Sequence, residues 1–182
     1  MKRLRSLAVA AMFALTAYAQ IVPAAKITPD PTLHAPRPAL ANLELLLDTR
    51  LFALGTANDP VDMLGRTRGI YLPNYGAVFT SEISLIITPT VSPFRLTITK
   101  EMHDQVHQRK IARIPALRAA MTEMIRQAAG QLPQVPENQQ IVVAVRLKYV
   151  SWEDRTGLPS QLMVSATRKD ALNGVVQATE EQ

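Results

Sequence analysis

The sequence predicts an α+β fold, a two-layer sandwich in which two helices pack on one face of a mostly antiparallel sheet, in the order α-β-β-α-β-β. Leucines recur at helical spacing between residues 39 and 54, and a longer helical pattern covers residues 99–129. Two pairs of β-rich runs lie at residues 68–88 and 140–167. A sheet covered on one side by the helices would bury the apolar face of each helix and leave the other face of the sheet more exposed to solvent. We expect one domain over residues 39–172.

The first helix is predicted over Ala39 to Leu54. Pro38 suits its first turn and Gly55 suits its C-terminal cap. Leu46 and Phe52 widen the apolar stripe, which favours packing against a sheet. Residues at steps of three and four share one face of a helix, and here these are Leu40, Leu43, Leu47, Leu51 and Leu54.

Turn-forming residues separate the next two runs, 68–72 and 76–88, which predicts a β-hairpin around Pro73-Asn74-Tyr75. The second run alternates, so every other residue should face the core. The face expected to be buried carries Ala77, Phe79, Ser81, Ile83, Leu85 and Ile87.

The second helix is predicted over Thr99 to Ala129, with Thr99 as N-cap and Gly130 at its C-terminal side. Pro115 interrupts the pattern, so either the helix kinks or two helices meet there. The expected core stripe is Ile111, Ile114, Leu117, Met121, Ile125 and Ala128.

The last pair of strands is predicted at residues 140–152 and 158–167, joined by a loop at 153–157 as a second hairpin. Arg146 and Lys148 fall on the outward face of the first of these strands. From Arg168 the sequence is polar, so we expect a short helix and then a fraying tail over residues 173–182.

Residues 1–19 have the features of a secretory signal peptide: basic residues, a short apolar run and the cleavage pattern Ala17-Tyr18-Ala19. The apolar run is shorter than the roughly 20 residues of a membrane-spanning helix. Residues 20–38 are proline-rich and predict an extended linker or arm. We therefore expect a periplasmic or secreted bacterial protein without a transmembrane span once the segment is cleaved; an uncleaved N-terminal anchor is the alternative.

Composition removes several classes of function. Lys2, Arg3 and Arg5 supply three charges of the formal +5, which leaves +2 for the rest of the chain. A nearly balanced domain does not predict nucleic acid as a partner, and binding to anionic lipid or polysaccharide would need a clustered positive face. The chain has no cysteine, which excludes disulfides and thiol catalysis.

The strongest chemical candidate is His103-Asp104-Gln105-Val106-His107. Two histidines four residues apart project from one helix face and could bind one zinc ion. The motif is similar to the zincin signature, but Asp104 replaces the glutamate that acts as general base there. Glu123 is conceivable as a third ligand, with Pro115 between. The alternatives are a metal-dependent hydrolase and an exposed polar helix face without a cofactor, and we favour the second.

A binding surface is a further possibility at the first hairpin. Tyr71, Asn74, Tyr75 and Glu82 surround it, and aromatic side chains at a turn can recognise a peptide or glycan. The competing interpretation is that both tyrosines line the margin of the core, as amphipathic rings commonly do.

The segment GIYLPNYGAVF, from Gly69 to Phe79, resembles a hairpin of uncharacterised exported bacterial proteins with an aromatic-Gly-x-Val-Phe junction. The resemblance covers about a dozen residues, implies an envelope or secreted context and brings no activity. We therefore expect a non-catalytic binding or assembly domain. Its partner would be an envelope protein or peptide, bound through the exposed sheet face or the first hairpin.

Overall fold

A computed structural model of the chain describes residues 35–88 and 97–181. The predicted signal peptide and residues 20–34 of the predicted linker lie outside these ranges. The described helices are α1 (Arg37–Phe52), α2 (Lys100–Gln131) and α3 (Arg168–Leu172). The described strands are β1 (Asp62–Met63), β2 (Arg68–Leu72), β3 (Gly76–Ser84), β4 (Gln140–Leu147), β5 (Gln161–Thr167) and β6 (Gln177–Glu181).

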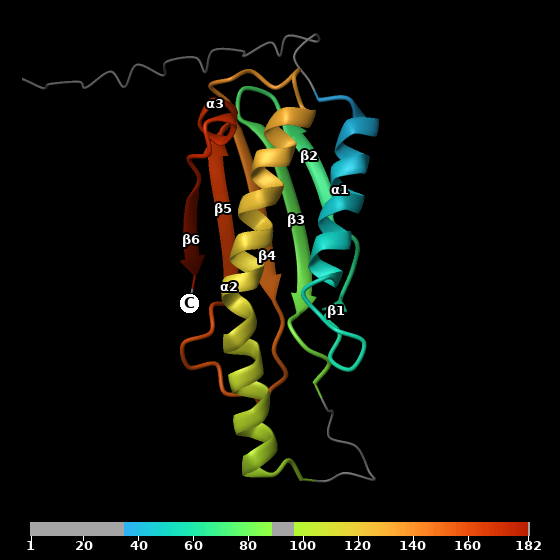
Figure 1. Ribbon diagram of the computed structural model, residues 1–182, viewed down its shortest axis with the longest axis vertical. Coiled ribbons are helices and arrows are strands. Elements are labelled where there is room, and N and C mark those ends of the chain that lie inside the picture. Colours follow the sequence, from blue (N-terminus) through green and yellow to red (C-terminus); the bar gives the residue numbers. More distant parts are fainter. Residues whose placement is uncertain (1–34, 89–96, 182) are drawn as a thin grey trace, which may run out of the picture.

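The strands form one mixed, mostly antiparallel sheet, confirming the α+β prediction. Its order is β1-β3-β4-β5-β6. β2 also pairs with β3, along a different part of that strand from the part that pairs with β1. β3 and β4 run parallel, whereas every other pair is antiparallel. Both predicted hairpins, β2–β3 and β4–β5, are present, and α2 connects the two central strands (Figure 1).

The sheet has one face covered by helices and one open face. Figure 1 shows α1 and α2 lying side by side on the same side of the strands. The predicted face of β3 is buried from Ala77 to Leu85, but Ile87 is exposed beyond the end of the strand. The buried side chains of α1 are the predicted Leu40, Leu43, Leu47 and Leu51, whereas Phe52 faces solvent.

Helix α2 is one continuous helix, so neither a second helix nor a break occurs at Pro115. Its 32 residues extend about 48 Å, and the nine residues of β3 only about 30 Å. The N-terminal half of α2 therefore projects beyond the sheet, where the loop between β4 and β5 runs beside it (Figure 1). Most of the predicted core stripe is buried, but Ile111 is exposed and Lys110 is buried in its place.

Helix α1 also covers the outer edge of β2. Glu44 accepts hydrogen bonds from the backbone N–H of Gly69 (2.7 Å) and from Arg37, which in turn donates to the carbonyl of Gly69. One turn further along, Asp48 accepts from the backbone N–H and hydroxyl of Thr67. These bonds occupy outward backbone groups at Thr67 and Gly69, which disfavours pairing of another chain with this part of the edge.

The C-terminal segment, expected to fray, adds a strand to the sheet. After α3 the chain turns back, and β6 pairs with β5 at the other sheet edge. Arg118 of α2 forms an ion pair with Glu180 of β6. Across the ranges that the structure describes, no helix combines the length and apolar character needed to span a bilayer.

Candidate functional site

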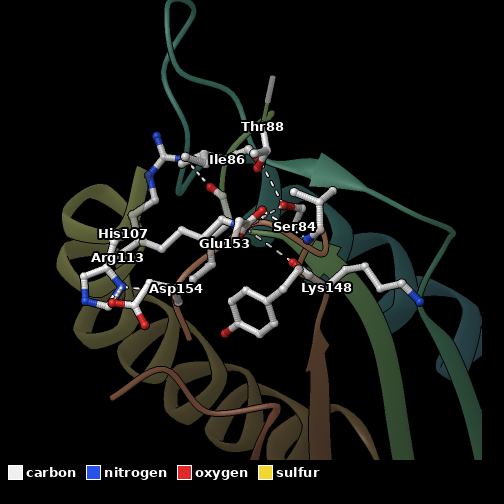
Figure 2. Close-up of polar contacts among 12 residues, drawn as sticks. Ser84, Ile86, Thr88, His107, Arg113, Lys148, Glu153 and Asp154 are labelled. Carbon is white, nitrogen blue, oxygen red and sulfur yellow. Dashed lines mark hydrogen bonds and ion pairs between the residues drawn. The ribbon is translucent and has the colours of Figure 1, made fainter. Parts of the chain in front are cut away.

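The histidine pair lies on the part of α2 that projects beyond the sheet. The His103 ring packs at a tilt against Trp152, with 6.1 Å between ring centroids. The Nδ1 atom of His107 lies 3.1 Å from the backbone oxygen of Asp154 and 3.9 Å from its carboxylate. Figure 2 shows His107 and Asp154 facing each other. Both histidines thus contact the loop between β4 and β5.

Among the described residues, no third ligand completes a metal site with the histidines. Asp104 is exposed and lies 3.6 Å from the Lys100 ammonium and 3.8 Å from Nδ1 of His103. Glu123 lies sixteen residues beyond His107 in the same helix, a separation of about 24 Å. Within residues 35–88 and 97–181, no three histidine, aspartate or glutamate side chains are grouped closely enough to hold a metal ion.

A buried polar cluster that the sequence analysis did not single out lies next to the histidines (Figure 2). The Nζ atom of Lys110 lies 2.5 Å from a carboxylate oxygen of Glu153, and the two side chains are only 0% and 1% exposed. The same ammonium lies 3.4 Å from the Ser84 hydroxyl and 4.8 Å from the centre of the Tyr149 ring. The cluster therefore joins α2, the end of β3 and the loop after β4.

Burial shifts the pKa values of two members of this cluster. It lowers the pKa of Lys110, and the hydrogen bond and charge of Glu153 oppose that shift. Burial also raises the pKa of Tyr149, as does the negative charge of Glu153, while Arg155 opposes them. The Tyr149 hydroxyl donates to the carbonyl of Pro159 at 2.7 Å. Every polar group is engaged within the protein, so the cluster joins elements and presents no reactive group to solvent.

One sequence signal for this cluster existed. Lys110 stands four residues after Val106 and four before Ile114, both buried, so it is a charged residue within an apolar stripe. A lysine in such a position needs a buried partner. The position of Glu153, in a loop 43 residues later, has no comparable signal.

The four residues proposed at the first hairpin do not form one surface. Tyr71 faces the helices, packs against the core and donates to the side chain of Gln139 at 2.8 Å. Tyr75 is exposed at the turn beside Asn74, which has a left-handed φ of 64°. Glu82 lies toward the far end of β3 on the open face and pairs with Lys148 at 3.3 Å. Tyr71 thus follows the core-margin interpretation.

The turn itself is fixed by Gly76, which begins β3. Its φ of 133° lies in the region that favours glycine. A Cβ atom there would lie 1.8 Å from the carbonyl oxygen of Gln140, the first residue of β4. The glycine therefore permits the close approach of the two parallel strands, and the N–H of Gln140 donates to Tyr75 at 2.7 Å.

We define the open face as the strand side chains that point away from α1 and α2. Neighbouring strands align these residues into rows across the sheet. One row is apolar and contains Ile70, Val78 and Val142; Ile70 is 55% exposed, Val78 is partly buried, and Val142 is only 3% exposed. The following rows are more polar and include Arg68, Thr80, Ala144, Met163, Glu82, Arg146 and Gln161.

A hollow of about 360 Å³ lies within these polar rows; we call it the basic hollow. Its lining includes Leu64, Arg66, Arg68, Glu82, Ala144 and Arg146. Lys148 engages Glu82, but none of the three arginines forms an ion pair with a described residue. The even charge balance of the sequence does not predict this grouping, because the arginines come from a turn and two strands.

Comparison with known proteins gives no family for this chain. No protein-family model matches the sequence, and no curated protein or solved structure is significantly similar to it.

Proposed function

We propose that this chain is an exported bacterial envelope protein whose folded domain binds a partner through the open face of its sheet, without catalysis. The observation that carries the proposal is the asymmetry of the sheet. One face is packed against α1 and α2, and the other exposes apolar and basic side chains of β2 and the basic side chain of Arg146 on β4.

The covered part of the β2 edge disfavours that edge as the contact. Because side chains of α1 occupy the outward backbone N–H of Thr67 and both backbone groups of Gly69, a partner strand would have to displace them to pair there. The open face beside it has Ile70 and Leu72 exposed by 55% and 40%. Neighbouring exposed apolar residues with polar ones around them are typical of interaction sites.

The part of the proposal that the protein is exported rests on the sequence alone. The basic, apolar and Ala-x-Ala parts of residues 1–19 support a signal peptide, and the resemblance of the first hairpin to exported bacterial proteins supports the same compartment. The absence of cysteine is compatible with an oxidising compartment, because no thiol is available to oxidise.

Affinity capture with matched variants tests the proposal. The tagged mature chain and an Ile70→Ser, Leu72→Ser variant are each incubated with bacterial envelope extract, and captured proteins are compared by quantitative mass spectrometry. We expect a specific protein to be captured by the wild type and lost from this variant. The control, Leu172→Ser with Val175→Ser, removes exposed apolar side chains away from the open face and should retain it.

Self-association is measured by sedimentation velocity, because a second copy is also a possible assembly partner. If the wild type stays monomeric and its captured proteins match those of the Ile70→Ser, Leu72→Ser variant, the open face is not a binding surface and the proposal is wrong.

A further inference from the structure

We propose that the partner of the open face is an acidic peptide segment, whose carboxylates bind at the basic hollow and whose apolar side chains pack on the exposed Ile70 and Leu72 of β2. This inference rests on the proposed function and adds the chemical class of the partner. It follows from the charge and the layout of the open face.

None of the arginines of the basic hollow forms an ion pair with a described residue, although Arg68 lies near enough to Glu44 to lower its pKa. Arg66, Arg68 and Arg146 line one hollow, and the one carboxylate among its described lining residues, Glu82, is engaged by Lys148 at 3.3 Å. Three guanidinium groups around one hollow repel each other unless an anion lies among them. Arginine binds carboxylate through two parallel hydrogen bonds, so a carboxylate is a suitable anion.

The strands hold two of these arginines in fixed positions. Arg68 pairs with Thr80 across β2 and β3, and Arg146 pairs with Glu82 across β3 and β4. The arginines therefore lie on either side of β3, opposite positions two residues apart along that strand. An extended segment carrying several acidic side chains can place a carboxylate at each of them.

Exposed apolar side chains next to the hollow distinguish a peptide from other polyanions. Ile70 and Leu72 follow Arg68 on the open face of β2 and are 55% and 40% exposed. A polyuronate has no apolar side chains to pack on these two residues. An anionic bilayer presents a broad surface of headgroups, whereas the arginines here surround a hollow. An acidic peptide with interspersed apolar residues complements both parts of the surface.

The test uses a fluorescein-labelled peptide of repeated Glu-Glu-Leu-Leu, which presents both residue types on one side when extended, with binding to the mature chain measured by fluorescence anisotropy. We expect the Arg68→Gln, Arg146→Gln variant to lose affinity by about tenfold, since charge-assisted hydrogen bonds to both arginines are removed. The charge-matched control, Arg126→Gln with Lys169→Gln on α2 and α3, should bind within about twofold of the wild type because exposed charges outside a contact contribute little.

Three comparison probes define the outcomes: a lysine–leucine peptide, alginate and phosphatidylglycerol vesicles. Weaker binding of all three than of the glutamate–leucine peptide supports the inference. Equal or tighter binding of alginate or vesicles overturns it, as does equal loss of affinity in the two double variants. If the acidic peptide fails to bind but the Ile70→Ser, Leu72→Ser variant still loses a captured protein, the partner class is wrong and the open face remains the binding surface.

Thermal unfolding of each variant checks that its fold is intact. Arg68 and Arg146 are exposed and form no ion pair with described residues, so their substitution should leave the midpoint close to that of the wild type.

Discussion

Lys110 and Glu153 face each other where solvent does not reach either side chain. Removing two charges from water is costly, and the attraction within the pair offsets this cost only while both partners are present. The pair also joins helix α2 to a loop that contributes no strand to the sheet. These two residues are therefore one attachment of the projecting half of α2, together with the buried Val106 and the ion pair of Arg113 with Asp59.

We expect Lys110→Met and Glu153→Leu each to lower the free energy of unfolding by about 3–5 kcal/mol, because each leaves one buried charge unpaired. The double variant should recover most of the loss, since no charge is then buried. Urea denaturation followed by circular dichroism measures all four proteins. A loss of unfolding free energy below about 1 kcal/mol in either single variant would show that water reaches the remaining charge.

Tyr149, in the same cluster, should make the stability of the protein depend on pH. Its pKa in the folded state is raised above the ordinary value of 10.0, so above pH 10 the unfolded chain releases this proton while the folded chain retains it. Stability contributed by Tyr149 is complete below pH 10 and is lost as pH rises from there toward its raised pKa.

We therefore expect the wild type to lose stability faster than a Tyr149→Phe variant above pH 10. Unfolding free energies of both proteins between pH 8 and pH 11 measure the difference. The variant should be less stable at pH 8, because it lacks the hydrogen bond to Pro159. The difference in unfolding free energy between the two proteins should then narrow as the pH rises. A gap that stays constant would mean that Tyr149 titrates alike in both states.

At the scale of elements, α1 protects the sheet as well as packing on it. Burial would raise the pKa of Glu44, but its hydrogen bonds with Arg37 and with the Gly69 amide outweigh that effect and lower the pKa. Glu44 is therefore charged at neutral pH. One helix side chain satisfies an edge backbone group and neutralises Arg37 at the same time.

Replacing Glu44 with alanine should lower the free energy of unfolding by about 1–3 kcal/mol, because the Gly69 amide and the Arg37 guanidinium lose their acceptor. Light scattering should also rise on incubation, since the edge of β2 becomes available for pairing. Glu123→Ala removes a half-exposed carboxylate of α2 and serves as the control. Equal effects of the two substitutions would argue against edge protection.

The elements themselves were largely predictable because their patterns are local. The leucine steps of α1 and the alternation of β3 and β4 follow from one buried face each. The outcome at Pro115 was not predictable, since packing along α2 decides whether a proline is tolerated inside a helix. Likewise β6 is a polar segment exposed along its length, and only its pairing with β5 makes it a strand.

At the scale of the whole molecule, stability should decrease outward from the centre of the sheet. β3 and β4 are buried on the helix face and bonded on both sides, whereas β6 is exposed at every position and bonded on one. We expect amide hydrogens of β3 and β4 to exchange slowest and those of β6 fastest among the strands. Hydrogen exchange followed by mass spectrometry tests this order, and slow exchange of β6 would contradict it.

The candidate site was less predictable than the fold because it depends on the order of the strands. Glu82 and Arg146 lie 64 positions apart in the sequence, yet they are neighbours through the parallel pairing of β3 with β4. Neither charge pattern nor periodicity indicates that contact. The histidine spacing, by contrast, was visible in the sequence, but whether a third ligand is near depends on what packs against α2.

The same parallel pairing governs how the chain folds. Every residue pair in this ladder closes a loop of 64 residues, from Gly76 with Gln140 to Ile83 with Leu147. Such a loop costs about 2 kcal/mol more entropy than one of eight residues. The two hairpins can form early from local contacts. The parallel pairing of β3 with β4 can form only after α2 has brought the two strands together. Folding should therefore be slow for a chain of this length. Until β3 and β4 pair, Phe79 and the other side chains of the sheet face that packs against α1 and α2 stay exposed to solvent. We expect the chain to be most prone to aggregate at that stage.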